Sequence, residues 1–371
     1  MNARNIIIEK AAKLLLEEKL VAFPTETVFG LGGDATSDIA CNKIYSLKNR
    51  PSYNPLIIHV SSIEEAEKIA ILNKQALLIA DHFWPGPITM ILPLRKGHNI
   101  CKVARGGNDK TIAIRISCNS LALEIIKRAG KPLAAPSANK SGKLSSTKYI
   151  HVYEQFKKSS EILNINSKDN NKRKELFVIN DKEINQLVEK SELENNKEKY
   201  IPGYYGLEST IIDLSNFYND NIKILRPGII SARKIENKTG LNITYIDSLK
   251  NNQHKPKILP KAEAIFPGML KKHYSPNAKL RLNVTSLKKN EIGLGFGKIN
   301  LINKLYPDFN YNLSVRENYE ECARNIYNFL YIADKFIENI DTIDTIAVSP
   351  IGSTDIGVAI NNRLIRAASE D

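Results

Sequence analysis

Apolar residues follow two different spacings in the first 150 residues, and each spacing predicts a different element. Between residues 5 and 18 they recur every three or four positions, which is typical of an amphipathic helix. The apolar run Leu20–Phe23 stops at Pro24 and predicts a buried strand followed by a loop. By the same criteria we expect strands at 56–60, 88–92, 111–116 and 133–135, and helices at 38–48, from Ser62 onward and at 121–129. Because strands and helices alternate irregularly and prolines interrupt several strands, the pattern favours an α/β domain with a twisted, mixed sheet.

The pattern changes after residue 156. Residues 157–200 are rich in Lys, Glu, Asn and Ser and hold only short apolar patches such as Leu176–Ile179, which indicates a mobile insertion. Residues 247–262 read as a polar linker, and a last α/β unit begins near Lys279. That unit is expected to hold strands at 292–294 and 345–348 and helices at 319–337 and 358–368. We therefore predict a first domain at 1–240, a linker at 241–278 and a smaller, Rossmann-like α/β domain at 279–371.

Length and composition exclude several protein classes. With 371 residues, 42% of them hydrophobic and 25% charged, the chain resembles a globular protein of two or three domains. No stretch approaches the roughly 18 apolar residues that a spanning helix requires. Three glutamates, Glu9, Glu17 and Glu18, interrupt the N-terminal region, so it lacks the layout of a signal peptide and we expect cytoplasmic localisation. The four cysteines are scattered, which argues against a disulfide framework or a zinc site.

Positive charge is concentrated in the first part of the chain. The formal net charge is +13, and residues 1–150 carry 21 Lys and Arg against 12 Asp and Glu. This excess fits an anionic ligand, which is either a nucleotide or a nucleic acid. A lysine-rich residue usage without functional meaning is the alternative.

Standard catalytic signatures are missing, including the phosphate-binding P-loop, the serine-hydrolase elbow and the zinc-protease helix. A glycine string at Gly293, Gly295 and Gly297 lacks the spacing of a dinucleotide site. Instead, loops of hydroxyl, amide and basic residues follow the predicted strands, and such groups suit phosphates and carboxylates. Taken singly, each has a plain structural alternative: a turn at 137–139, a core histidine at His59, an ion pair of Arg115 and core packing of Trp84.

Taken together, nine strings occur in a recognisable order: PTETVFGLG, KNRPSYNPLIIHV, FWPGPITMIL, TIAIR, PLAAPSANKSGKLSST, GLESTIIDL, ILRPGII, PGMLKKHYSP and IAVSPIGSTDIGVAINNRLIRAA. In this order the chain resembles the threonylcarbamoyl-AMP synthase family in its two-domain form, which has a YrdC-like catalytic domain. The resemblance covers the chain apart from about 157–200.

The resemblance implies a nucleotidyltransferase that joins L-threonine, bicarbonate and ATP into threonylcarbamoyl-adenylate and releases pyrophosphate. In that family the product serves modification of the adenosine beside the anticodon of tRNA, and a partner transferase complex performs the second step. Mg²⁺ is implied with the triphosphate, while any protein ligands for it stay unknown. A site that positions anions and stabilises charge agrees with the missing nucleophile signatures.

Residue roles are implied by the same resemblance. The threonine pocket would be lined by Thr27, His59, Arg115, Ala135 and Ser209, with Arg115 on the substrate carboxylate. ATP would be held by Arg50, Asn54, Thr111, Ser137, Asn139, Ser145, Arg226 and Tyr274. The catalytic charges would be Lys48, Arg50 and Arg115, with Lys48 and Arg50 at the phosphates. Tyr274 would return over the nucleotide at the end of the linker, and closure of the linker would exclude water.

Two features depart from the family pattern. The family usually has an Asp-Gly-Gly string before the Glu-Ser-Thr motif, whereas this chain has Tyr200–Gly206, and the segment before it is longer than usual. Lysines within 157–200 either contact tRNA or partner proteins or belong to a solvated insertion without function, and the composition of the segment favours the insertion. The main alternative function is an RNA-binding or ribosome-maturation module of the same fold. A carbamoyltransferase subdomain is disfavoured because its accessory segments are missing.

Overall fold

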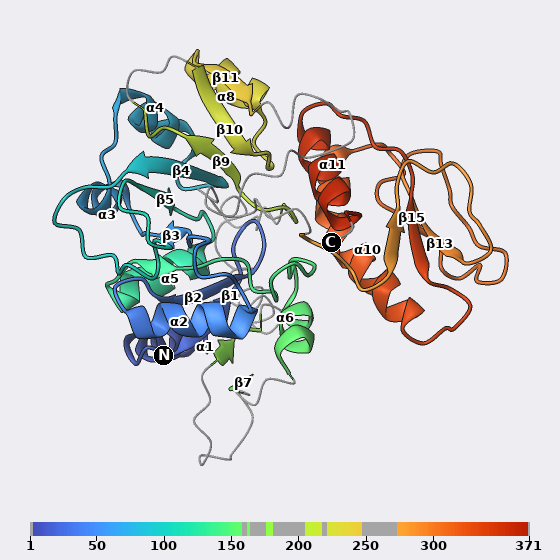
Figure 1. Ribbon diagram of the computed structural model, residues 1–371, viewed down its shortest axis with the longest axis horizontal. Helices are drawn as coiled ribbons and strands as arrows, with labels where there is room; N and C mark the ends of the chain where they lie inside the picture. The colour runs from blue at the N-terminus through green and yellow to red at the C-terminus, as the bar shows by residue number, and fades with distance from the viewer. Residues whose placement is uncertain are drawn as a thin grey trace, which may run out of the picture.

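The computed structural model describes residues 3–157, 162–163, 176–180, 205–216, 221–246 and 273–369. The chain forms two α/β units that lie side by side (Figure 1). The larger unit comprises the described residues up to 246, and the smaller unit comprises residues 279–369. Residues 273–278 lead into the smaller unit and stay attached to the larger one, because the Ser275 backbone N donates to Gly142 O at 2.8 Å.

The larger unit is built on a mixed sheet of eleven strands in the order β11-β10-β9-β4-β5-β3-β6-β2-β1-β8-β7. Its strands are β1 (Leu20–Phe23), β2 (Gly30–Asp34), β3 (Ile58–His59), β4 (Ile88–Pro93), β5 (Thr111–Arg115), β6 (Leu133–Ala134), β7 (Ile162–Leu163), β8 (Leu176–Val178), β9 (Thr210–Asp213), β10 (Asn221–Arg226) and β11 (Asn242–Tyr245). Its helices are α1 (Ala3–Leu16), α2 (Asp38–Lys48), α3 (Ile63–Ile69), α4 (Lys74–Phe83), α5 (Ser120–Ala129), α6 (Tyr149–Phe156) and α8 (Ala232–Thr239). The expected mixed α/β architecture is confirmed.

Strand β1 lies in the middle of the hydrophobic core, with both of its faces buried. Val21 and Phe23 belong to a cluster with apolar residues of α1 and α5, which cover one face of the sheet. Leu20 and Ala22 belong to the main cluster on the opposite face, where α2 contributes Ile44. Successive side chains of a strand point to opposite faces, so an uninterrupted apolar run is what a doubly covered strand requires.

Polar residues fix the start of α3 and the end of α2. The Ser62 hydroxyl accepts a hydrogen bond from Glu65 N at 3.3 Å, which confirms the predicted start of α3. At the end of α2, Asn49 adopts the left-handed conformation with φ of 50°. Asparagine tolerates this conformation better than most residues do. The turn at Asn49 directs the chain from Lys48 to Arg50, two residues that were assigned to phosphates.

Strand β2 corrects the prediction of a loop over Pro24–Gly32. The strand pairs with β1, with Val21 opposite Gly32, although its sequence is largely glycine. A Cβ atom at Gly32 would lie 2.5 Å from the Phe23 ring. Small residues are therefore needed where β2 passes over the Phe23 ring. Because glycine has a low propensity for strands, the sequence pattern did not predict β2. The predicted strand at 56–60 is also shorter in the structure, where only Ile58–His59 is extended.

Two segment predictions are corrected as well. Leu176–Val178, assigned to the insertion, forms β8, which is buried and pairs in parallel with β1. Asn242–Tyr245, assigned to the linker, forms β11 at the edge of the sheet. Most of the predicted insertion and the polar stretch 247–262 lie outside the described residues.

The smaller unit has a parallel sheet of four strands in the order β12-β15-β13-β14. Its strands are β12 (Lys279–Arg281), β13 (Glu291–Gly295), β14 (Tyr311–Asn312) and β15 (Thr345–Val348), and its helices are α10 (Tyr319–Ile337) and α11 (Ile356–Ala367). Both helices lie on the side of the sheet that faces the larger unit (Figure 1). One hydrophobic cluster accordingly includes Leu207 of the larger unit and Ala323 of α10.

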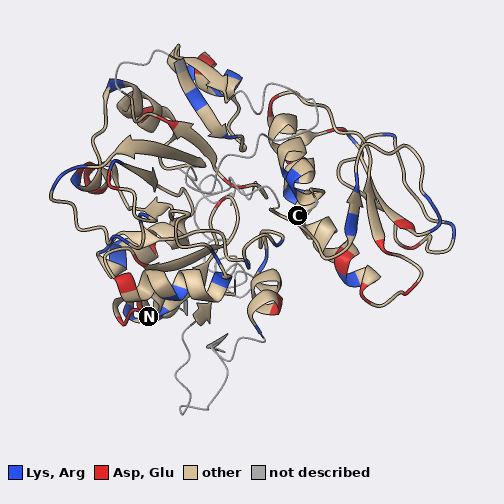
Figure 2. Ribbon diagram, in the orientation of Figure 1, with Lys and Arg blue, Asp and Glu red and all other residues tan. Residues whose placement is uncertain are grey.

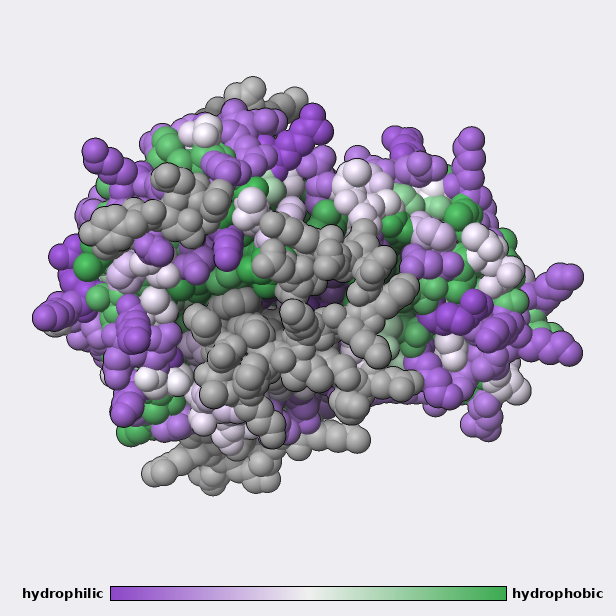
Figure 3. All heavy atoms as spheres, turned by 45° about the horizontal axis from the view of Figure 1, so that its top comes forward, coloured by the Kyte–Doolittle hydropathy of each residue, from purple (hydrophilic) through white to green (hydrophobic). Residues whose placement is uncertain are grey.

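The outer surfaces of the two units are largely polar. On the face in Figure 3, hydrophilic residues predominate along the rims of both units. Among the described residues, no helix combines the length and the apolar character needed to cross a membrane.

Candidate active site

A cavity lies where the ends of several strands converge. Its walls come from the β1–β2 connection, the ends of β3, β5 and β10, the segments after α2 and β6, the residues before β9, and the residues that lead into the smaller unit. The lining residues are Thr25, Thr27, Val28, Phe29, Gly30, Arg50, Ile57, His59, Arg115, Ala135, Pro136, Ser137, Glu208, Ser209, Arg226, His273 and Tyr274.

All five residues predicted for the threonine pocket line this cavity: Thr27, His59, Arg115, Ala135 and Ser209. The sheet explains how they meet. Strands β3 and β5 are parallel neighbours, and their register places His59 directly beside Arg115. Residues far apart in the sequence therefore share one wall, although their individual roles stay predictions.

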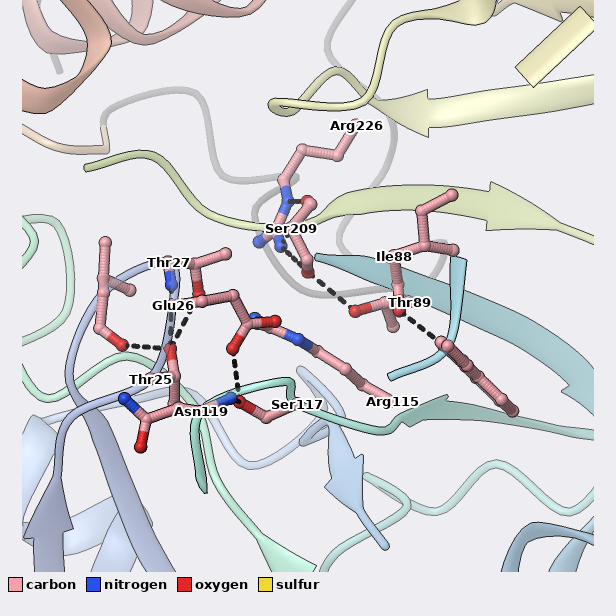
Figure 4. Close-up of polar contacts among 12 residues, drawn as sticks. Thr25, Glu26, Thr27, Ile88, Thr89, Arg115, Ser117, Asn119, Ser209 and Arg226 are labelled. Carbon is pink, nitrogen blue, oxygen red and sulfur yellow. Dashed lines mark hydrogen bonds and ion pairs between the residues drawn. The ribbon is translucent and has the colours of Figure 1, made fainter. Parts of the chain in front are cut away.

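Arg115 is paired inside the cavity with a glutamate that the sequence analysis did not single out. The Arg115 Nη2 atom donates to Glu26 Oε1 at 2.7 Å, and the Ser117 hydroxyl donates to Glu26 Oε2 (Figure 4). Burial raises the pKa of Glu26, but the charge of Arg115 and the bonds from Ser117 and Arg115 outweigh it, so the pKa is lowered overall. The buried Nε of Arg115 has no hydrogen-bond partner among the described residues. Arg115 is thus both an ion pair and a cation with donor capacity left.

His59 is neutral at physiological pH. Burial and, to a smaller extent, the charge of the neighbouring Arg115 together lower its pKa to about 3. Its buried Nδ1 finds no partner in the described part of the chain. The ring therefore offers hydrogen-bonding capacity beside Arg115 without adding charge. The alternative of a fully satisfied core histidine is not supported.

Arg50 and Asn54 form one unit at the phosphate side of the predicted site. The Arg50 Nε donates to Asn54 O at 3.1 Å, and Nη2 donates to Asn54 Oδ1 at 2.7 Å and to Pro55 O at 2.9 Å. Burial lowers the pKa of Arg50 to about 10, which leaves the guanidinium charged. Arg50 lines the cavity, whereas Asn54 does not and instead fixes the orientation of Arg50.

Arg226 is held by the backbone and side chain of Ser209. Its Nη2 donates to Ser209 O at 2.9 Å and to Ser209 Oγ at 3.0 Å, and Nε donates to the same carbonyl at 3.1 Å. The Ser209 hydroxyl is also within 2.7 Å of Thr89 Oγ1 (Figure 4). A predicted threonine contact and a predicted ATP contact are thus directly linked.

The family resemblance assigns Lys48 as a catalytic charge at the phosphates, and this role stays a prediction. Its side chain is 1% exposed and does not line the cavity. The Nζ donates to Ser137 O at 2.5 Å and to Asn139 O. Burial lowers the pKa of Lys48 well below its usual value, and the nearby Arg50 adds to this effect. Lys48 therefore secures the loop that carries Ser137.

Three other predicted ATP residues also lie outside the cavity lining. Thr111 is at the opposite end of β5 from Arg115 and lines a separate small cavity. The TIAIR string alone does not reveal which end of the strand faces the site. Asn139 donates to Lys140 O at 2.8 Å within its own loop. Ser145 donates its hydroxyl to Glu208.

The cavity has a cationic environment. His273 illustrates this, because burial lowers its pKa well below the usual value and Arg50, Lys48, Arg366 and Arg226 lower it further. Glu208 of the lining is paired with Arg363, and Glu26, which stands between the lining residues Thr25 and Thr27, is paired with Arg115. Such a cavity suits anionic ligands.

The described ranges contain no cluster of three or more His, Cys, Asp or Glu side chains that would hold a metal ion. Glu208 of the lining and Glu26 beside Thr25 are already bound to arginines, so they do not form a dedicated cation site.

Sequence reasoning missed Glu26, Glu208, Ser117 and Thr89 as site residues. Glu26 and Glu208 stand inside the quoted PTETVFGLG and GLESTIIDL strings, so their position was the available signal. Ser117 and Thr89 carry no signal of their own, because their role depends on which strands become neighbours.

Comparison with known proteins gives two family models. One, described as telomere recombination, matches residues 13–180, and the other, described as the C-terminal domain of threonylcarbamoyl-AMP synthase, matches residues 230–369. The chain is 32% identical to the threonylcarbamoyl-AMP synthase of Pyrococcus abyssi, covering 97% of this chain and 94% of that protein. It is also 32% identical to the Bacillus subtilis protein of the same name, covering 97% and 92%. The crystal structure of P. abyssi Sua5 complexed with L-threonine matches with a TM-score of 0.71 and 29% identity over 97% of this chain and 94% of that chain.

Proposed function

Because the chain belongs to the threonylcarbamoyl-AMP synthase family, we propose that its cavity joins L-threonine, bicarbonate and ATP into threonylcarbamoyl-AMP and releases pyrophosphate. The observation that carries this proposal is the convergence of the five predicted threonine residues on one buried, cationic cavity. The name of each relative and the L-threonine in the P. abyssi structure support the same substrate.

Arg115 is the proposed partner of the threonine carboxylate. Its pairing with Glu26 fixes the guanidinium in the cavity, and its Nε remains available as a donor. Neutral His59 adds a hydrogen-bonding group without a second charge. The cationic lining residues Arg50, Arg115 and Arg226 would favour the unprotonated amine of threonine, which is the form that attacks carbon.

The proposed reaction balances without a covalent enzyme intermediate. The threonine nitrogen forms a bond to the bicarbonate carbon and water leaves, which gives a carbamate. A carbamate oxygen then attacks the α-phosphorus of ATP, and the bond to the β-phosphate oxygen breaks to release pyrophosphate. Arg50 and Arg226, both charged and fixed by neighbouring carbonyls, would stabilise the negative charge that develops on the leaving group.

Mg²⁺ would enter as part of the ATP complex. The lining offers hydroxyl and backbone groups but no free pair of carboxylates, so we derive no step from a protein-bound metal. Ser137 and Tyr274, which both line the cavity, would contact the nucleotide, as the sequence resemblance implies.

We further propose that the product serves a tRNA threonylcarbamoyl transferase complex in the cytoplasm. Direct tRNA contact is not needed for the reaction itself. Lys and Arg are distributed over both units instead of forming one stripe (Figure 2). This distribution supports a small-molecule site over the alternative of an RNA-binding or ribosome-maturation module.

The test is pyrophosphate release by the full chain with ATP and Mg²⁺, with and without L-threonine and bicarbonate. We expect release only when both are present, and loss of release in Arg50→Ala and Arg115→Ala. Arg128→Ala is the matched control, because Arg128 is exposed and pairs with Glu9 far from the cavity. Release that ignores threonine would refute the proposal. So would tight, salt-sensitive RNA binding by a chain without this activity.

A further inference from the structure

Glu208 is a buried carboxylate at the border between the two units. Its side chain is 6% exposed, and it lines the cavity of the larger unit. It accepts a hydrogen bond from Arg363 Nε at 2.7 Å, from the Tyr327 hydroxyl at 3.1 Å to each oxygen, and from the Ser145 hydroxyl. Burial raises the pKa of Glu208, but the charge of Arg363 and then that of Arg226 outweigh it, so the pKa is lowered overall.

Two of these three partners come from the smaller unit. Tyr327 lies on α10 and Arg363 on α11, the two helices that face the larger unit in Figure 1. Arg363 is 1% exposed and its guanidinium lies over the Tyr274 ring, 5.1 Å from the centroid. Arg363 of the smaller unit therefore packs directly on Tyr274, a residue of the cavity lining.

The backbone beside Glu208 is fitted closely to the same helices. Gly206 has a φ of 71°, and a Cβ atom there would lie 2.3 Å from Ala323 O on α10. Only glycine permits both this conformation and this approach. The segment before β9 is thus seated on the smaller unit, and its position depends on that contact.

Glu208 is followed by Ser209, the residue that holds Arg226. The Ser209 carbonyl and hydroxyl both receive hydrogen bonds from Arg226. Arg226 also acts electrostatically on Glu208, so it is the next cation available to this carboxylate. Arg363 satisfies Glu208 and leaves Arg226 directed to Ser209 and the cavity.

We propose that Arg363 is a positioning residue for the synthase: by neutralising Glu208 from the smaller unit, it keeps Arg226 on Ser209 in the orientation that receives the nucleotide. Tyr327 supports the same carboxylate. This inference rests on the proposed function, since it assigns Arg226 to ATP. It gives the smaller unit a defined part in the reaction, although among its described residues none lines the cavity.

The alternative is that Arg363 only holds the two units together. Loss of a mere anchor would lower stability without a preference for either substrate. Loss of a positioning residue has a different signature, because an uncompensated Glu208 would attract Arg226 away from Ser209. Removing the charge of Glu208 as well would end this attraction, so Arg226 would again bind Ser209.

The experiment compares the full chain with Arg363→Met, with Glu208→Gln combined with Arg363→Met, and with Lys335→Met. Steady-state pyrophosphate release gives KM for ATP and for threonine, and calorimetry gives the Kd of each. For Arg363→Met we expect the KM and Kd for ATP to rise at least about 10-fold, the size expected for one charge-assisted contact. The values for threonine should change less than 3-fold. Lys335→Met removes an exposed charge of α10 and should match the parent.

Recovery in the double variant is the decisive result. We expect it to regain most of the ATP affinity that Arg363→Met loses, which an anchor without a positioning role would not do. If Arg363→Met fails to fold, Tyr327→Phe is used instead, and it should raise the ATP Kd in the same direction by a smaller factor. Unchanged ATP affinity in folded Arg363→Met, or no recovery in the double variant, overturns the proposal. An inactive parent protein would refute the proposed function instead, and ATP calorimetry would still test Arg363.

Discussion

Two buried glutamate–arginine pairs border the cavity, and they differ in where the arginine points. Glu26 and Arg115 belong to the larger unit, and Arg115 lines the cavity. Glu208 meets Arg363 of the smaller unit, and Arg363 lies outside the cavity lining. Both pairs have an N···O distance of 2.7 Å, and both glutamates have a lowered pKa.

The difference shows that ion pairs of the same two residue types can serve different purposes. In the first pair the carboxylate orients Arg115, a cation that lines the cavity and that we propose binds the threonine carboxylate. In the second pair the cation neutralises a carboxylate, and we propose that this keeps a third residue, Arg226, bound to Ser209. Buried pairs contribute little net stability, so their value here lies in fixing geometry.

The largest effect is expected from Arg115→Ala. It leaves Glu26 buried without its cation, and we expect the free energy of unfolding to fall by about 3–5 kcal/mol. Pyrophosphate release should fall by at least about 100-fold, since the carboxylate contact is also lost. Urea denaturation and the release assay measure the two effects.

Glu26→Gln combined with Arg115→Ala separates the two pairs. It should recover stability but not activity, whereas the corresponding double variant at Glu208 and Arg363 should recover ATP affinity. Recovery of activity in both double variants would remove the distinction.

Gly206→Ala tests whether the second pair depends on close docking of the units. The added methyl group meets the backbone of α10, so we expect unfolding to be easier by about 1–3 kcal/mol, with weaker ATP binding. Gly240→Ala is the matched control, because Gly240 has a φ of 69° and open space around its Cβ position. It should cost only about 1 kcal/mol of conformational strain and leave ATP binding unchanged. Equal effects of both substitutions on ATP binding would contradict close docking.

Lys48→Met tests a cation that neither touches the cavity nor pairs with a carboxylate. The carbonyls of Ser137 and Asn139 lose their donor, so we expect kcat/KM for ATP to fall about 10-fold, less than in Arg50→Ala. Lys43→Met on the same helix should leave ATP kinetics unchanged. A fall in kcat/KM for ATP as large in Lys48→Met as in Arg50→Ala would indicate that Lys48 acts on the phosphates directly.

Acid titration gives the smallest expected effect. Because the pKa values of Glu26 and Glu208 are lower in the folded chain than their usual value of 4.5, both groups add stability above that value. This contribution is lost as the pH falls below 4.5 toward the lowered values. We expect the Tm to fall less steeply with acid in Glu26→Gln and Glu208→Gln than in the parent. An unchanged slope in either variant would show that its carboxylate keeps an ordinary pKa.

The sequence predicted the residue types at the cavity better than the contacts among them. The threonine set converged because its members stand at the ends of strands of one sheet or in the segments next to those ends. Arg363 and Glu208 are separated by 155 positions, and no local pattern relates them. The family resemblance placed Lys48 at the phosphates, whereas in the structure its ammonium group donates to the backbone carbonyl of Ser137.

The sheet itself shows a similar division. Strand β1 was predictable from its apolar run, since hydrophobic strands bury both faces. Strand β2 was not, because glycines are required there by the Phe23 ring and leave no propensity signal. Strand β8 was hidden by the polar residues that surround its three apolar positions.

The central claim is that one cavity brings threonine, bicarbonate and ATP into a single product. The most direct measurement is mass spectrometry of the product formed by the full chain from ATP, L-threonine and ¹³C-bicarbonate with Mg²⁺. The account predicts threonylcarbamoyl-AMP that carries one ¹³C atom, and its loss in Arg115→Ala. Formation of AMP or of a threonyl-adenylate without the label would contradict it.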